Sequence, residues 1–370
     1  MTISTSERKL LENLCNACAV SGDEGEVRAI VLEELKGQPV EVKVDALGNV
    51  LATRNSSSER NSSSDRLGSS PEKRLRVMLA AHMDEVGFML TNDEGEGIFR
   101  FDTVGNVDER QLVGKPVWVG RDHVAGVIGA KAIHLTTPAE RKNAMALDTL
   151  RIDLGLANEY IRDSNSKVKI GDRATFATPF TQTGPSLRGK ALDDRLGVAT
   201  LIELVKNPPP QIDLLAAFTV QEEIGLRGAR VAAYTFDPDI AIVLDCSPAF
   251  DLPTWDGAEN AVYNTRLGAG PAIYVADSGT LSDPRLVRHF IETAEASNIP
   301  YQLRQPGGGG TDAGAIHKTR AGIPSISVSI PGRYLHTAIN LARLSDWQNT
   351  LTLLHLALER LTPAVLTGER

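Results

Sequence analysis

The chain has 370 residues, enough for two average domains, of which 42% are hydrophobic and 23% charged. Its formal net charge is −8. Nucleic acids and anionic membrane surfaces attract clustered Lys and Arg, so this acidic balance argues against both as main partners. The composition is that of an ordinary globular protein that can bury a sizeable core.

The sequence also gives no sign of a membrane segment. No apolar run approaches the roughly 20 residues that a membrane-spanning helix requires. The first residues, MTISTSERKLLENL, contain no uninterrupted apolar stretch of the signal-peptide type. We therefore expect a cytoplasmic protein.

Two helices are predicted at the start of the chain. Apolar residues recur at helical spacing over about residues 7–19, and the sequence SGDE at 21–24 predicts a capping box that begins a second helix. Cys15 and Cys18 form a C-x-x-C pair on the apolar face of the first helix, and no second pair follows. A position in the core is therefore favoured for both thiols over a redox or metal-binding role.

The remaining elements predict two kinds of architecture. Residues 54–74 are rich in Ser and polar throughout, which predicts a flexible loop. Residues 87–185 contain several short strand-like runs without intervening helices, typical of a small β-barrel or sandwich. Helix–strand alternation resumes after this region. We therefore expect a discontinuous, doubly wound α/β domain of residues 1–86 and 186–370 with the β-rich domain inserted.

Polar residues gather where the predicted strands of the α/β domain end. In open α/β sheets, ligands bind beyond the carboxyl ends of the strands. The residues expected at these ends, or just after them, are His82, Asp84, Glu222, Glu223, Asp245 and His336, and Asp193 and Asp194 stand at the mouth of a helix. Imidazole and carboxylate ligands without a thiolate suit Zn, Co or Mn.

The number of these residues fits two metal ions that share a bridging carboxylate better than one ion. Two ions about 3.5–4 Å apart can clamp a water molecule, lower its pKa and polarise a carbonyl, which is hydrolase chemistry. Of the adjacent glutamates Glu222 and Glu223, which end an apolar strand-like run, one can bind metal while the other moves the proton. Asp84 is placed to hold the second ring nitrogen of His82.

Each motif has a simpler interpretation when it stands alone. An H-x-D motif is often incidental, two aspartates before a helix are usually an N-cap, and glutamates at a strand end are usually solvated. Their combination at the strand ends of one sheet favours a metal site.

At this point three specific kinds of protein remain open. A two-metal deacylase or carboxypeptidase would use the same ions but hold a different end of the substrate. A glycosidase could use Glu222 and Glu223, although retaining glycosidases need carboxyl groups about 5–5.5 Å apart on opposite sides of the sugar. A peptide-binding or scaffold protein with a decayed site is the non-enzymatic alternative, against which the complete ligand set argues.

The chain resembles the M42 metallo-aminopeptidases, a family of exopeptidases with two catalytic metals that includes the TET particles and glutamyl aminopeptidases. The resemblance runs from about residue 10 to residue 355. It rests on the sequences SGDEGEVR, AAHMDEVGFML, TVGNVDERQLVGKPVWV, KALDDRLGVATLIELV, VQEEIGLRGA, VLDCSPA, GPAIYVADSG, GGGGTDAGAI and GRYLHT, which follow the family order.

The resemblance implies a role for each site residue. It implies two divalent ions per subunit, with Zn or Co favoured and Mn also suited to the ligands. The implied ligands are His82 and Asp245 on one ion, Glu223 and His336 on the other, and Asp193 as the bridge. Glu222 is implied as the general base that accompanies attack by a metal-bound hydroxide, and Asp84 as the residue that orients His82.

The resemblance also implies a substrate and an assembly. The substrates would be peptides, from which N-terminal residues are removed. Thr311 and Asp312 are candidates for substrate contact in a pocket-lining loop. The inserted domain would be a PDZ-like dimerisation domain, and the enzyme a homo-oligomer built from dimers, up to a dodecamer.

Overall fold

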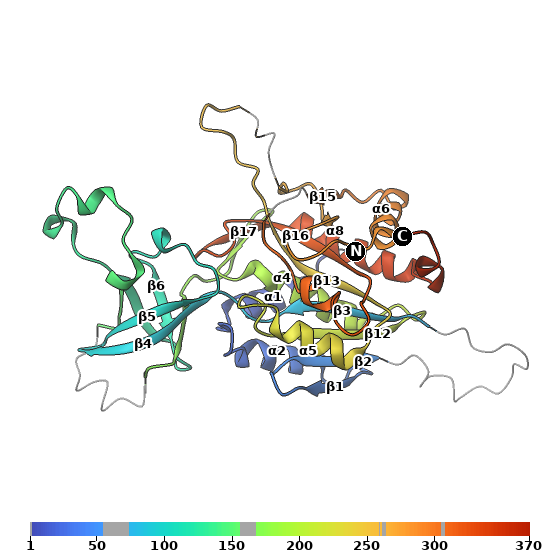
Figure 1. Cartoon of the computed structure of the whole chain (residues 1–370), viewed down its shortest axis with the longest axis horizontal. Coiled ribbons are helices and arrows are strands. Elements are labelled where there is room, and N and C mark those ends of the chain that lie inside the picture. Colours follow the sequence, from blue (N-terminus) through green and yellow to red (C-terminus); the bar gives the residue numbers. More distant parts are fainter. Residues whose placement is uncertain (1, 55–73, 156–167, 259, 261–263, 305–307) are drawn as a thin grey trace, which may run out of the picture.

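The computed structural model describes residues 2–54, 74–155, 168–258, 260, 264–304 and 308–370 (Figure 1). The predicted Ser-rich loop therefore lies outside the described residues, apart from its two ends. The described chain forms a large sheet covered by helices, which we call the α/β unit, and a β-barrel at one end of it (Figure 1).

The α/β unit is built on one mixed sheet, in which eleven strands are found among the described residues. The central strands β12, β3, β13 and β16 are parallel, and those on either side pair antiparallel. In spatial order the strands are β1 (Glu41–Val44), β2 (Val50–Arg54), β12 (Asp213–Thr219), β3 (Arg76–His82), β13 (Ile240–Pro248), β16 (Ser325–Arg333), β17 (Asn340–Arg343), β11 (Ser186–Gly189) and β10 (Thr181–Thr183); β14 (Ala272–Tyr274) pairs with β16 and with β15 (Gln302–Arg304).

Helices cover both faces of this sheet, because apolar residues alternate along its central strands. In β3, Val77, Leu79 and Ala81 pack on one face, and Met78 and Ala80 on the other. The first face carries α1 (Thr5–Asn16), α2 (Gly25–Leu35), α4 (Leu192–Lys206), α6 (Pro284–Ala296) and α8 (Leu344–Arg360), and the second carries α5 (Arg227–Phe236) and α7 (Ala313–Ile316). The predicted doubly wound fold is confirmed, and its sheet is mixed.

The barrel closes on itself through six strands. Around the barrel these are β4 (Gly87–Gly95), β5 (Ile98–Val104), β8 (Arg151–Asp153), β7 (Val124–Gly129), β6 (Pro116–Val119) and β9 (Arg173–Phe176). Phe88 lies inside and makes edge-to-face contacts with Phe101 and Phe176. The assignment of residues 87–185 to a separate domain stays a prediction. β10 lies within this range but pairs in the large sheet.

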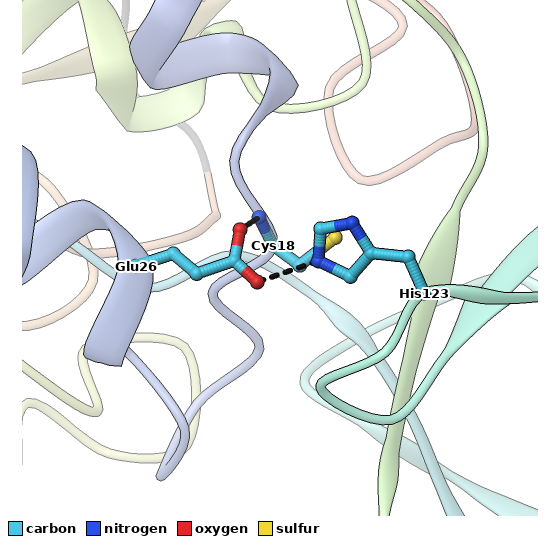
Figure 2. A group of neighbouring side chains, drawn as sticks. All are labelled: Cys18, Glu26 and His123. Carbon is cyan, nitrogen blue, oxygen red and sulfur yellow. Dashed lines mark hydrogen bonds and ion pairs between the residues drawn. The ribbon is translucent and has the colours of Figure 1, made fainter. Parts of the chain in front are cut away.

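Two predictions about the first helices are wrong. Cys15 is buried in the core, but Cys18 follows the end of α1 and lies half-buried beside Glu26 and His123, next to the barrel (Figure 2). The hydroxyl of Ser21 does not cap α2, whose N-cap is Glu24 without a side-chain hydrogen bond. The capping sequence failed because the Ser21 hydroxyl bonds a buried carboxylate instead.

In the part of the chain that the structure describes, no helix is both long and apolar enough to cross a bilayer.

Candidate metal centre

The predicted ligands meet at the carboxyl edge of the parallel strands. His82 is the last residue of β3 and is paired in register with Thr219, the last residue of β12. Glu222 and Glu223 follow β12 in a loop, so the prediction that they end the strand is wrong. Asp245 likewise lies inside β13, which extends beyond it. The strands therefore end at other residues than predicted, but Glu222, Glu223 and Asp245 still lie at the same edge of the sheet.

Both histidines are oriented by backbone carbonyl groups. Nδ1 of His82 lies 3.2 Å from the carbonyl oxygen of Asp84, and Nδ1 of His336, in the loop after β16, lies 3.0 Å from that of Asn106. A carbonyl oxygen only accepts hydrogen bonds, so each Nδ1 carries the proton and each Nε2 is left for a metal. Asn106 follows β5, and the barrel therefore helps to orient His336.

Asp193 lies between the two histidines. Its Oδ1 atom is 3.2 Å from Nε2 of His82, and its Oδ2 atom is 3.6 Å from Nε2 of His336. Asp245 Oδ1 is 3.8 Å from the same nitrogen of His82, and Glu223 Oε2 is 3.3 Å from that of His336. Two histidine–carboxylate pairs thus flank one carboxylate that faces both, an arrangement that suits two ions with a bridging ligand.

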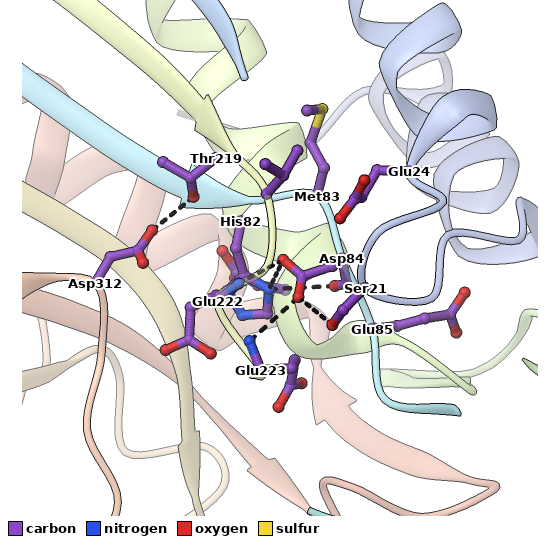
Figure 3. Close-up of polar contacts among 12 residues, drawn as sticks. Ser21, Glu24, His82, Met83, Asp84, Glu85, Thr219, Glu222, Glu223 and Asp312 are labelled. Carbon is purple, nitrogen blue, oxygen red and sulfur yellow. Dashed lines mark hydrogen bonds and ion pairs between the residues drawn. The ribbon is translucent and has the colours of Figure 1, made fainter. Parts of the chain in front are cut away.

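Asp84 organises the glutamate loop as well as lying close to His82 (Figure 3). Its Oδ1 atom accepts the backbone N–H of Glu222 at 3.0 Å, and its Oδ2 atom accepts that of Glu223 at 3.1 Å and the Ser21 hydroxyl at 2.6 Å. Nδ1 of His82 is 3.6 Å from Oδ1 of Asp84. Burial alone would raise the pKa of Asp84, but the interaction with His82 and these hydrogen bonds hold it below its usual value. Asp84 is therefore a charged anchor for the loop.

The charge at this cluster fits divalent cations. Burial, helped by the neighbouring Asp193, raises the pKa of Glu223 to about 8 and that of Asp245 to about 6. Burial opposes the charged form of His336, yet Asp193 and Glu223 outweigh it and raise the pKa to about 9. The metal-free site thus keeps protons that cations would displace, and its ligand types suit Zn, Co or Mn.

Glu222 has a different environment from that of the ligands. Burial and the carboxylates of Asp245, Asp312 and Glu223 raise its pKa well above the usual value, although His82 opposes this shift. The residue is half-buried, and Figure 3 shows its carboxylate pointing away from the hydrogen bonds that Asp84 makes. A half-exposed carboxyl group with a raised pKa is a candidate for accepting and returning a proton.

Three other residues considered from the sequence are buried. Asp194 accepts the backbone N–H of Gly197 at 3.0 Å, and a Cβ at Gly197 would come within 2.3 Å of its carboxylate oxygens. Thr311 Oγ1 lies 2.8 Å from the Ser327 hydroxyl, and Asp312 accepts from the hydroxyl of Thr219 at 2.6 Å. Thr311 and Asp312 are each only 1% exposed, and their contact with substrate stays a prediction.

Sequence reasoning missed the buried ion cluster behind the site. Glu85 accepts hydrogen bonds from Lys190 at 2.5 and 2.7 Å and from Arg195 at 3.2 Å. Thr175 of β9 donates to the same carboxylate at 3.0 Å, and this contact joins the barrel to the α/β unit. Glu85 directly follows Asp84, but nothing in the sequence of one chain signals that Lys190 and Arg195 fold back onto it.

This fold and cluster define the class of metal-dependent hydrolases with an α/β catalytic unit. The sequence matches the family model of the M42 glutamyl aminopeptidases over residues 66–353, and the chain belongs to this family. It is a peptide hydrolase of the aminopeptidase type, and the family is one of metallopeptidases that use divalent ions.

Known proteins resemble the chain over nearly its whole length. It is 31% identical to a lysyl aminopeptidase of Pyrococcus furiosus, with 97% of this chain and 99% of that protein covered. The solved TET aminopeptidase of a marine sediment Thaumarchaeota archaeon has a TM-score of 0.87 at 34% identity, with 99% of both chains covered. The Pyrococcus horikoshii TET1 peptidase, described as assembling into a tetrahedron or a large octahedral shell, has a TM-score of 0.80 at 30% identity over 96% of this chain and 100% of that one.

Proposed function

We propose that this aminopeptidase removes N-terminal residues from peptides with two divalent metal ions bridged by Asp193. The observation that carries the proposal is that one carboxylate faces Nε2 of both His82 and His336 through its two different oxygens. Asp245 completes the ligands beside His82, and Glu223 those beside His336. Zn or Co is the favoured metal, and Mn also suits these ligands.

The protein and the ions divide the chemistry between them. When bound, such ions polarise the scissile carbonyl and lower the pKa of water. Glu222 accepts the proton of the attacking water at its carboxylate and returns it to the leaving amine. Asp84 keeps this carboxylate in place, because it binds the backbone N–H groups of both Glu222 and Glu223. His82 and His336 hold their Nδ1 protons on carbonyl groups throughout, so their ring orientation does not change.

We also propose a homo-oligomer built from dimers. The TET1 peptidase of Pyrococcus horikoshii supports this, since it can assemble into a tetrahedron or a large octahedral shell. Light scattering on the purified protein is expected to give a mass that is an even multiple of the 39.8 kDa chain, with a dodecamer as the largest assembly. A monomer at micromolar concentration would contradict this part of the proposal.

The activity is tested with paired peptides. Short peptides that differ in their first residue are supplied with a free or an acetylated N-terminus, with and without chelator. We expect cleavage of the free-amine peptides alone, loss of activity with chelator, and recovery on adding Zn, Co or Mn. Equal or faster cleavage of the acetylated peptides would instead support the two-metal deacylase or carboxypeptidase alternative.

A further inference from the structure

A second group of metal-binding side chains lies where the barrel meets the α/β unit. Cys18 is in the connection between α1 and α2, Glu26 is in the first turn of α2, and His123 is in the turn between β6 and β7 (Figure 2). One ligand atom from each lies within 4.8 Å of those of the other two. The catalytic cluster contributes none of these residues.

Hydrogen bonds hold the three side chains in place. Oε2 of Glu26 accepts the backbone N–H of Cys18 at 2.9 Å, which leaves Oε1 facing Nε2 of His123 at 2.5 Å. His123 has a φ of +50°, a conformation that residues other than glycine rarely adopt. Figure 2 shows that the ring points from the barrel toward the α/β unit and lies against Glu26 and the sulfur of Cys18.

The thiol of Cys18 is the least satisfied member of the group. Among the described residues its Sγ atom has no hydrogen-bond partner, whereas the thiol of Cys246 donates to the carbonyl of Leu192 at 3.3 Å. A metal ion would displace the thiol proton of Cys18 and gain a thiolate ligand.

We propose that Cys18, Glu26 and His123 bind one divalent ion of the zinc type that ties the barrel to the α/β unit. Thiolate, imidazole and carboxylate are all zinc ligands, with bonds of about 2.0–2.3 Å, and three of them leave a fourth position. A cavity of about 450 Å³ adjoins Cys18 and Glu26 and has room for a water ligand there.

Three guanidinium groups line the same cavity, but each has an oxygen partner of its own. Arg28 donates to the carbonyl of Gly48 at 3.1 Å, Arg173 donates to that of Ser21 at 3.2 Å, and Arg121 lies 3.8 Å from the Asp23 carboxylate. Within the group itself Glu26 supplies the carboxylate, and this negative charge suits a cation.

The position of the ion would couple it to the catalytic half of the molecule. Cys18 is followed by Ala19, whose N–H bonds Glu85 at 2.9 Å, and by Ser21, whose hydroxyl bonds Asp84 at 2.6 Å. An ion bound by both Cys18 and His123 would hold this connection and the β6–β7 turn together. It is a structural ion, and its existence does not depend on the two-metal mechanism.

Titration with Co²⁺ distinguishes this site from the catalytic centre by its absorption spectrum. The proposed catalytic ligands contain no sulfur, so a sulfur-to-cobalt charge-transfer absorption reports on a thiolate site alone. Metal-free protein, kept reduced without added thiols, is titrated with Co²⁺. We expect the absorption in the unmodified protein and in Cys246→Ala, and its loss in Cys18→Ser. His123→Ala, a change in a half-exposed turn, is expected to lower the apparent Co²⁺ affinity at this band at least tenfold.

Cys246→Ala is the matched control, because this thiol lies close to Asp193 and Asp194 and is the other sulfur that could meet a metal. Absence of the absorption from the unmodified protein would overturn the proposal. So would its persistence in Cys18→Ser or its loss in Cys246→Ala alone. Recovery of chelator-treated activity by Co²⁺ without the absorption would leave the catalytic proposal standing and reject this one.

Discussion

Two clusters of buried carboxylates lie side by side in this protein, and they are neutralised in opposite ways. Glu85 is paired with Lys190 and Arg195, and its pKa is held below the usual value because these cations outweigh the effect of burial. Asp193, Glu223 and Asp245 have no such partner among the described lysines and arginines. A buried charge must be paired or bound to a metal, so the first cluster supports structure, and we propose the second as the metal site.

The largest expected effect comes from Glu222, which belongs to the second cluster without being a proposed ligand. Glu222→Gln keeps the size of the side chain but removes the proton acceptor. Turnover is expected to fall by roughly 10²–10⁴-fold with metal content unchanged. Steady-state kinetics and metal analysis on the same sample check this, and near-normal turnover would remove Glu222 from the mechanism.

The next effect concerns stability and belongs to the first cluster. Glu85→Gln leaves the buried Lys190 and Arg195 without their carboxylate, which typically costs about 3–5 kcal/mol of unfolding free energy. The matched control is Glu34→Gln, which breaks the half-exposed pair with Lys206 (2.7 Å) and should cost less than about 1 kcal/mol. Denaturant unfolding compares the two variants. Equal losses of unfolding free energy would mean that the buried Glu85 cluster contributes no more stability than the half-exposed ion pair.

Asp84 lies between the clusters, and its replacement should weaken metal binding without abolishing it. Asp84→Asn keeps the shape but loses the charge that faces His82 and the glutamate loop. Changes of this kind next to metal ligands typically cost about 10–100-fold in affinity. Competition with a fluorescent chelator measures the dissociation constant of the metal. An unchanged metal affinity would show that the charge of Asp84 is not needed to keep the loop of Glu222 and Glu223 in place.

The smallest effect is a pH dependence that only the metal-free protein should show. The pKa of Glu223 is raised from 4.5 to about 8, that of Asp245 from 3.8 to about 6, and that of His336 from 6.5 to about 9. The folded state therefore binds more protons than the unfolded state across this range. Stability contributed by these protons is complete at low pH and is lost as the pH rises through the folded-state values.

Thermal unfolding tests this sign. The metal-free protein is expected to lose several degrees in Tm between about pH 5 and pH 9, and saturating Zn²⁺ should flatten the dependence because bound ions replace the protons. A metal-free Tm that rises over this interval would contradict the assignment of unpaired charge to the second cluster.

The contrast also explains what the sequence could predict. The meeting of the predicted ligand residues can be predicted because parallel strands place their carboxyl ends at one edge, where His82, Asp245 and the residues after β12 lie together. The sequence predicts both glutamates at the end of the strand, because nothing in TVQEEIG marks the actual end of β12 at Thr219. The role of Asp84 as a loop anchor depends on backbone N–H directions, which no residue pattern encodes.

The junction residues could not be foreseen for a related reason. Cys18, Glu26 and His123 come from a connection, a helix and a hairpin turn, so their meeting depends on how the barrel sits against the α/β unit. Helical spacing predicts Cys18 in the core, but α1 ends before it, at Asn16. The same holds for Asn106, whose carbonyl reaches His336 from the barrel side.

The central claim is that two ions share Asp193, and anomalous diffraction from crystals of the Zn- or Co-loaded protein tests it most directly. We predict two peaks, one beside His82 and Asp245 and one beside His336 and Glu223, each within bonding distance of a different oxygen of Asp193. A single peak in this cluster, or two peaks of which one does not contact Asp193, would contradict the account.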